Sequence, residues 1–202
     1  MLLNRLRPKI EPILRKNQNG IRPGRSKLGQ ILTLRRIIEE ITYCNKTAVF
    51  IFYFSKAFDS VNREKMFEIL GLYGIPSEII NAITVLYSNT KSTILTPDGE
   101  TEHFDILAGI LQSDTLAPFL FIIVIDYIMC VSVDTMKENG LLYQPRRSSR
   151  YPALHITDAD FADDIALLSD NLANAQALLS ALESASNCTG LYRISSNKPP
   201  GG

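Results

Sequence analysis

Two adjacent carboxylates are the residues of this sequence best suited to chemistry. Asp163 and Asp164 follow Phe161 and Ala162, and short apolar runs at Leu154–Ile156 and 165–168 flank them. Neighbouring carboxylates at a hairpin tip repel each other, so the arrangement is unfavourable unless a cation neutralises it. Hard oxygen ligands suit Mg²⁺ or Mn²⁺, and a pair of such ions can catalyse phosphoryl transfer. The alternative is an ordinary turn, because aspartate is common in turns.

The elements that must position this pair follow from apolar spacing. The pattern predicts helices over 28–41, 59–70 (capped by Asp59 or Ser60), 77–87, 116–129 and 171–188. A run of β-branched and aromatic residues predicts a buried strand over 47–54, and 91–106 reads as a hairpin around a turn at 97–100. Residues 138–152 are polar and predicted to be irregular. The predicted class is α+β, an antiparallel sheet with helices on one face.

Composition indicates one globular domain. The chain has 202 residues, 46% hydrophobic and 21% charged, which excludes disorder as its main state. Three scattered cysteines give neither a disulfide framework nor a metal-ligand spacing and fit a reducing compartment. The most apolar stretch, 116–133, contains Pro118 and Asp126 and is predicted to be a buried core helix. With no signal peptide and no membrane segment, we expect an intracellular protein of the cytoplasm or nucleus.

Charge is unevenly distributed along the chain. Lys plus Arg and Asp plus Glu both number 21, but residues 1–36 hold ten of the basic residues and one acid, Glu11. This basic arm predicts contact with a polyanion. The alternative is a solvated basic segment.

Several blocks occur in an order that identifies a family. They are 18–26 (QNGIRPGRS), 54–61 (FSKAFDSV), 109–121 (GILQSDTLAPFLF), 156–169 (ITDADFADDIALLS), and Gly190-Leu191 with Lys198. In this order they resemble the fingers motif and palm motifs A, B, C and a faint D of non-LTR (LINE-like) retrotransposon reverse transcriptases. The resemblance covers about residues 17–198. It implies a right-hand fingers–palm fold without a thumb: 1–45 partial fingers with the basic arm, 46–198 palm and 199–202 tail.

The resemblance also implies an activity and roles for residues. It implies an RNA-directed DNA polymerase that uses Mg²⁺ or Mn²⁺ with an RNA template, a DNA primer and deoxynucleotides, and no membrane. Asp163 and Asp164 match the catalytic, metal-binding carboxylates of motif C. The matched binding positions are Phe58 (aromatic gate beside the nucleotide sugar), Gln112 (near nucleotide and template), Arg22 and Arg25 (near phosphates) and Lys198 (the motif D lysine). The alternatives are a core role for Phe58 and solvated arginines.

Departures from the family pattern predict weak or absent activity. Tyr53 stands where motif A begins with its metal-bridging aspartate, by substitution or after a small deletion, and Asp59 matches a later aspartate of that motif. A phenol with a pKa near 10 is neutral at pH 7 and cannot replace a bridging carboxylate. Ser113 replaces a glycine of motif B, and Ile21 replaces a phenylalanine of the fingers. We therefore expect weak binding of one divalent ion; the alternative function is a non-catalytic nucleic-acid-binding remnant.

Overall fold

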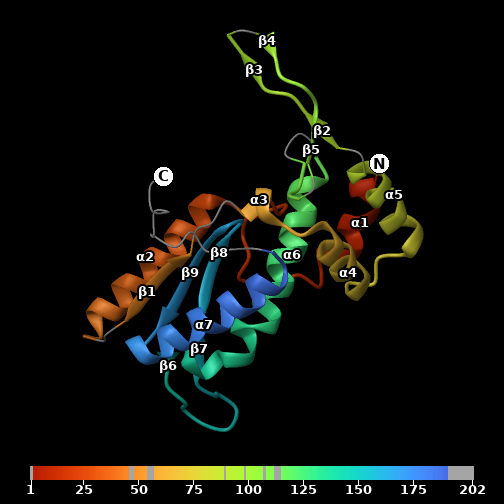
Figure 1. The fold of residues 1–202 in the computed structure, drawn as a ribbon. Helices are drawn as coiled ribbons and strands as arrows, with labels where there is room; N and C mark the ends of the chain where they lie inside the picture. Colours follow the sequence, from red (N-terminus) through yellow and green to blue (C-terminus); the bar gives the residue numbers. More distant parts are fainter. Residues whose placement is uncertain are drawn as a thin grey trace.

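A three-stranded antiparallel sheet forms the centre of the molecule (Figure 1). In the computed structural model, the described residues are 2–45, 48–53, 57–88, 90–97, 99–106, 108–111 and 115–190. The strand order is β1 (Val49–Tyr53), β9 (Asp164–Ser169) and β8 (Asp158–Phe161). Tyr53 pairs with Ile165, and Phe161 pairs with Asp164, so one end of the sheet carries the turn between β8 and β9.

Helices α6 (Ala117–Val131) and α7 (Leu172–Cys188) cover one face of this sheet. Helix α6 is apolar on all sides and almost wholly buried, as expected for the central helix of a core. Pro118 lies in its first turn, where a missing N–H breaks no helical bond. Asn171 caps α7, as its side chain accepts a hydrogen bond from the Asn174 N–H at 2.9 Å.

Helix α2 (Lys27–Tyr43) covers the other face, where Ile37 packs with Ala159 and Leu168. The sequence predicted helices on one face only. A helix is required on both because every residue of β9 from Ile165 to Ser169 is buried, so neither face of that strand can meet water.

The remaining elements surround this three-layer centre. They are α1 (Leu2–Ile10), α3 (Ala57–Ser60), α4 (Arg63–Leu72), α5 (Ser77–Tyr87), the 3₁₀ helix η1 (Val133–Asn139), β6 (Leu141–Gln144) and β7 (Leu154–Ile156). The predicted hairpin is confirmed and projects from the body: β2 (Lys91–Ser92) pairs with β5 (Phe104–Asp105), and β3 (Leu95–Thr96) pairs with β4 (Gly99–Glu100).

Three local features differ from what the sequence predicted. The helix predicted to start at Asp59 or Ser60 is divided in two, and α4 is capped by Asn62, which accepts from the Lys65 N–H at 3.1 Å. Helix α1 was not predicted, yet its Leu6 and Ile10 are buried in the main core. The polar stretch 138–152 contains β6, which pairs with β7.

The described residues include no single helix that is long and apolar enough to cross a membrane. Helices α6 and η1 reach that length and composition together, but they are bent by 45° at the break between them.

Candidate active site at the turn between β8 and β9

The turn that carries the two carboxylates is tight. Ala162 and Asp163 connect the paired residues Phe161 and Asp164, and Ala162 has a φ of 56°. A positive φ at the first central residue alone is the pattern of a type II′ hairpin turn, which normally has glycine there. An alanine in this conformation costs of order 1 kcal/mol, so its surroundings must hold the turn in place.

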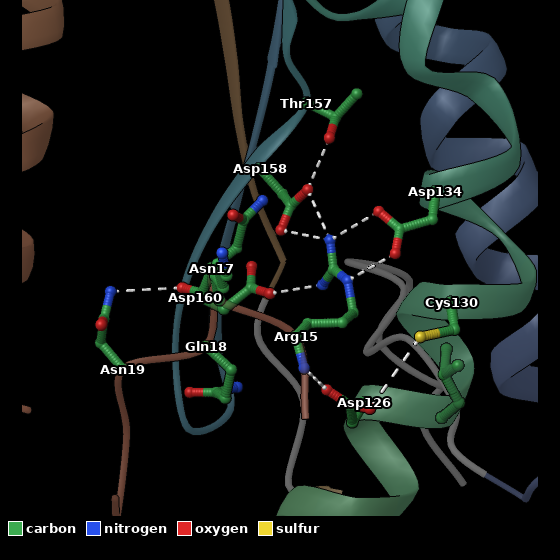
Figure 2. Close-up of polar contacts among 12 residues, drawn as sticks. Arg15, Asn17, Gln18, Asn19, Asp126, Cys130, Asp134, Thr157, Asp158 and Asp160 are labelled. Atoms are coloured by element: carbon green, nitrogen blue, oxygen red, sulfur yellow. Dashed lines mark hydrogen bonds and ion pairs between the residues drawn. The ribbon is translucent and has the colours of Figure 1, made fainter. Parts of the chain in front are cut away.

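Gln18, in the fingers block, holds that turn. Its Oε1 accepts hydrogen bonds from the N–H groups of Ala162 at 2.8 Å and Gly20 at 2.7 Å, and its Nε2 donates to the Ala162 carbonyl at 3.1 Å. The side chain is buried. The Asn19 N–H donates to the Asp160 carbonyl at 2.9 Å, so residues 17–19 run alongside β8 (Figure 2). The fingers block thus holds the turn that carries Asp163 through direct hydrogen bonds.

Gly20 is needed for this close approach, and Gly20→Ala is expected to lower the free energy of unfolding by about 2–3 kcal/mol. A Cβ at Gly20 would lie 2.1 Å from the Ala162 backbone nitrogen, so the turn would have to move. Gly29→Ala is the matched control, because a Cβ there meets only the Ser26 hydroxyl at 3.4 Å. Urea unfolding of the parent and both variants measures the effect. A Gly20→Ala variant as stable as the Gly29→Ala variant would contradict it.

The motif A position lies beside the same turn. Tyr53, the last residue of β1, pairs with Ile165, which places its backbone one residue along β9 from Asp164 and two from Asp163. Position 53 is therefore next to the turn that carries the pair. The described part of the chain contains no group of three or more His, Cys, Asp or Glu residues that could hold a metal ion. Among the described residues, the donor set at the turn consists of two carboxylates, which does not fit a two-metal centre.

The two carboxylates differ in exposure. Asp163 is half-buried in the turn, whereas Asp164 is exposed. Asp164 lines a groove of about 110 Å³ under α2, together with Lys27 and Gln30. Lys27 is exposed and is the cation placed on this groove by the fold.

Phe58 lies in α3, directly after the motif A strand. Its ring stacks on Phe121 of α6, with centroids 4.0 Å apart and an interplanar angle of 19°. The Phe58 carbonyl accepts a hydrogen bond from the Ile110 N–H at 2.8 Å, which ties α3 to the start of the motif B block. Half-buried, the ring has a packing role, and its role as a gate stays a prediction. Gln112 and Lys198 lie outside the described residues.

The two fingers arginines have different environments. Arg22 is buried: its Nε donates to Glu11 Oε1 at 2.6 Å, and its other nitrogens donate to main-chain carbonyls that include Gln18 at 3.2 Å. Its guanidinium is thus engaged within the fold. Arg25 is exposed and donates to the Asn19 side chain at 2.7 Å and to the Lys16 carbonyl. Arg25 is the better placed of the two for a phosphate.

A buried ion cluster that we did not predict lies beside β8 (Figure 2). Arg15 donates through Nη2 to Asp158 at 2.8 Å, through Nη1 to Asp160 at 3.1 Å and through Nε to Asp134 at 3.0 Å. Its backbone N–H donates to Asp126 at 2.7 Å. The side chains of Asp158 and Asp160 are completely buried. One cation therefore faces three carboxylates inside the protein.

The electrostatics of the cluster follow from burial. Burial lowers the pKa of the Arg15 guanidinium, but the carboxylates around it, Asp158 foremost, outweigh that effect and raise its pKa overall. Burial, and then the charge of Asp158, raise the pKa of Asp160 well above its ordinary value. Asp160 Oδ1 has no hydrogen-bond partner among the described residues. With its pKa raised on folding, Asp160 binds a proton more tightly in the folded protein than in the unfolded chain.

A neighbouring group extends the cluster into α6. The Tyr73 hydroxyl donates to Asp126 Oδ2 at 2.6 Å, and burial raises the pKa of Asp126. Burial, followed by the charge of Asp126, raises the pKa of the Cys130 thiol to about 11, so this thiol is protonated at neutral pH. The cluster joins the loop after α1 to α4, α6, η1 and β8.

Asp160→Asn is expected to stabilise the protein by about 1 kcal/mol at pH 7.5 and to have little effect at pH 4.5. Between the ordinary carboxyl pKa near 4 and its raised value, Asp160 binds a proton in the folded state that the unfolded chain has released. The parent therefore loses stability as pH rises through this range, and the amide removes that loss. Urea unfolding at the two pH values measures it; a variant destabilised at pH 7.5 would contradict the assignment.

Comparison with known proteins identifies the family of this chain. The family model described as "Reverse transcriptase (RNA-dependent DNA polymerase)" matches residues 1–199. The retrovirus-related Pol polyprotein from type-1 retrotransposable element R2 of Popillia japonica is 34% identical over 117 residues, which cover 57% of this chain and 15% of that polyprotein. The corresponding polyprotein from type-2 element R2DM of Drosophila melanogaster is 31% identical over 127 residues, 62% of this chain and 11% of its own length. This chain therefore spans a small part of these relatives.

Solved structures show the same fold at low identity. Apo telomerase from Candida tropicalis, truncated from its C-terminal domain, superposes with a TM-score of 0.64 at 13% identity and covers 96% of this chain and 38% of its own. Telomerase of the same organism in complex with a TWJ fragment of telomeric RNA gives a TM-score of 0.63 at 9% identity. The match covers 96% of this chain and 32% of that telomerase chain. The predicted fingers–palm fold is thereby confirmed. By family model, relatives and fold, this chain belongs to the reverse transcriptases, as a domain of the non-LTR retrotransposon type.

Proposed function

We propose that this reverse transcriptase domain has weak or no polymerase activity, because position 53 carries tyrosine. The observation that carries the proposal is the register: Tyr53 pairs with Ile165, beside the turn with Asp163 and Asp164. A neutral phenol at this point leaves the turn with two carboxylates.

Reverse transcriptases use divalent metal ions, and the residues at the turn are the ligands that this chain can offer such an ion. Asp163 and Asp164 supply oxygen ligands of the kind that Mg²⁺ prefers. With two carboxylates in place of three, the turn holds a single divalent ion weakly. The loss of a ligand shared by two ions costs several kcal/mol of transition-state stabilisation.

The nucleic-acid partners follow from the family and from exposed cations. We assign an RNA template, a DNA primer and deoxynucleotides as the partners, approaching the side of the sheet that carries the turn. Arg25 and Lys27 are exposed there, and Lys27 lines the groove next to Asp164. Arg35 and Arg36, further along α2, share Glu39 at 2.9 and 3.2 Å and are partly neutralised. Arg25 and Lys27 are therefore the cations that we place nearest the template.

Primer extension on a homopolymer RNA template, with Mg²⁺ and then Mn²⁺, tests the proposal. The chain as given is expected to yield no more product than Asp163→Ala, which measures any contaminating polymerase. If the unsubstituted chain extends primers and Asp163→Ala abolishes this extension, the proposal is overturned, since another group would then supply the missing ligand.

A second candidate function is non-catalytic binding of nucleic acid, favoured by the exposed cations Arg25 and Lys27. Filter binding of a template–primer across a salt series distinguishes this candidate from an inert remnant. A binder shows an affinity that falls steeply with salt and does not depend on sequence. No binding at physiological salt would exclude it.

A further inference from the structure

The loop between β6 and β7, residues 145–153, carries a concentrated positive charge. Arg146, Arg147 and Arg150 are all exposed, and Tyr151 beside them is 70% exposed. Within the described part of the chain, none of the three guanidinium groups has a hydrogen-bond or ion-pair partner. The loop is therefore a set of free donors around an exposed ring.

The main chain of this loop is ordered by its own hydrogen bonds. The N–H groups of Arg147 and Ser148 donate to the Tyr151 carbonyl at 3.1 and 3.4 Å, and the Tyr151 N–H donates to the Ser148 carbonyl at 3.2 Å. Because these bonds use only backbone atoms, the arginine and tyrosine side chains can be replaced without breaking the turn.

Further cations adjoin the loop across a cavity of about 320 Å³. Leu154, the first residue after the loop, lines this cavity together with His155, Lys16 and Lys137, and both lysines are exposed. Three acids adjoin these elements. Asp134 pairs with Arg15, Asp170 accepts hydrogen bonds from the Leu142 N–H, and Glu138 is exposed. The loop therefore adjoins a cavity lined by two further exposed cations.

This surface is separate from the candidate active site. The loop lies beyond the opposite end of the central sheet from α3 and the turn after β8 (Figure 1). Seven residue steps connect Leu154 to Phe161, which is up to about 23 Å of extended chain.

We propose that residues 145–153, with Lys16, Lys137 and His155, form a second nucleic-acid-binding surface, which takes the phosphodiester backbone of a single strand. The forked guanidinium groups bind phosphate oxygens in pairs. The exposed Tyr151 ring stacks on a base, as in single-strand binding proteins that combine cations with aromatic platforms. An exposed tyrosine among arginines favours a nucleic acid over a purely anionic surface. The inference goes beyond the proposed function, because it needs neither the turn nor its carboxylates.

Salt-dependent binding tests the proposal. Fluorescence anisotropy of labelled single-stranded 20-mers, RNA and DNA of one sequence, is measured from 50 to 200 mM KCl on the full chain. The triple variant Arg146→Gln/Arg147→Gln/Arg150→Gln is compared with the control Arg5→Gln/Lys65→Gln/Lys91→Gln, which removes the same charge from exposed positions elsewhere. The loop variant is expected to bind at least about tenfold more weakly at 100 mM and to reduce the salt slope by about 2, since each phosphate contact on a single strand contributes ~0.7.

Substitution of Tyr151 tests base stacking separately from charge. Tyr151→Phe is expected to bind like the parent, whereas Tyr151→Ser binds about tenfold more weakly with an unchanged salt slope. Equal losses for RNA and DNA support a backbone contact, and a loss for RNA alone supports a contact that includes the 2′-hydroxyl.

Two results would overturn the proposal. One is a loop variant that binds both strands as well as the control triple variant does. The other is nucleic-acid binding that is unchanged in the loop variant while binding to phosphatidylserine vesicles is lost, which would assign the surface to a membrane. Primer extension by the given chain would overturn the proposed function and leave this surface untouched.

Discussion

Tyr53→Asp is expected to raise primer extension at least about a hundredfold over the chain as given, which corresponds to ~2.7 kcal/mol of activation free energy. The register of β1 and β9 carries this expectation: position 53 pairs with Ile165, next to the turn, so an aspartate there adds a third carboxylate to Asp163 and Asp164. The register of β1 and β9 already places position 53 next to the turn, so no shift of one strand along the other is needed.

Two controls separate the carboxylate from other effects of this substitution. Tyr53→Phe changes the same position without adding charge and is expected to stay inactive. Asp163→Ala combined with Tyr53→Asp is expected to abolish the gain. Mn²⁺ titration followed by electron paramagnetic resonance gives a readout independent of turnover, with tighter binding in Tyr53→Asp than in the parent. If Tyr53→Asp neither extends primers nor binds Mn²⁺ more tightly, the loss of activity lies elsewhere, and Ser113→Gly becomes the next variant to test.

The central part of the fold could be predicted from the sequence. Helices α2, α5, α6 and α7 and strands β1, β7 and β9 carry their own apolar periodicity or dense β-branched runs, so local pattern and tertiary structure agree. Helix α1 was missed because Pro8 and its charged residues conceal a short apolar face. Strand β8 was missed because three of its four residues are Asp, Ala and Asp, which have little preference for strands.

The candidate site, too, could be predicted only in part from the sequence. Adjacent carboxylates and an ordered set of motifs identified the turn, but contacts between distant segments are not visible in a one-dimensional pattern. Gln18 belongs to a block that we recognised, yet its contact with Ala162 depends on residues 17–19 lying beside β8. Asp158 and Asp160 did carry a signal: acids two residues apart next to a buried strand share one face and need a cation.

Arg15→Met is expected to lower the free energy of unfolding by about 3–5 kcal/mol at pH 7.5, a large part of the 5–15 kcal/mol typical of a domain. Arg15 is the cation that contacts both Asp158 and Asp160, whose side chains are completely buried. Removing it leaves two buried carboxylates that must ionise without compensation or take up protons. Methionine preserves most of the apolar stem, so the loss of packing is small.

The pH dependence and a compensating variant identify the cause. Without Arg15, the pKa of Asp160 rises further, because that guanidinium opposes its upward shift. A raised folded-state pKa means that stability falls as pH rises, so the penalty of Arg15→Met is expected to be smaller at pH 4.5 than at pH 7.5. Adding Asp158→Asn and Asp160→Asn to Arg15→Met is expected to restore most of the stability, whereas Lys16→Met, at the exposed neighbour, changes it by about 0.5 kcal/mol or less. If the triple variant is no more stable than Arg15→Met, packing rather than charge holds the cluster together. A recovery would show that Arg15 stabilises the fold by neutralising β8, the strand that leads into the turn with Asp163 and Asp164.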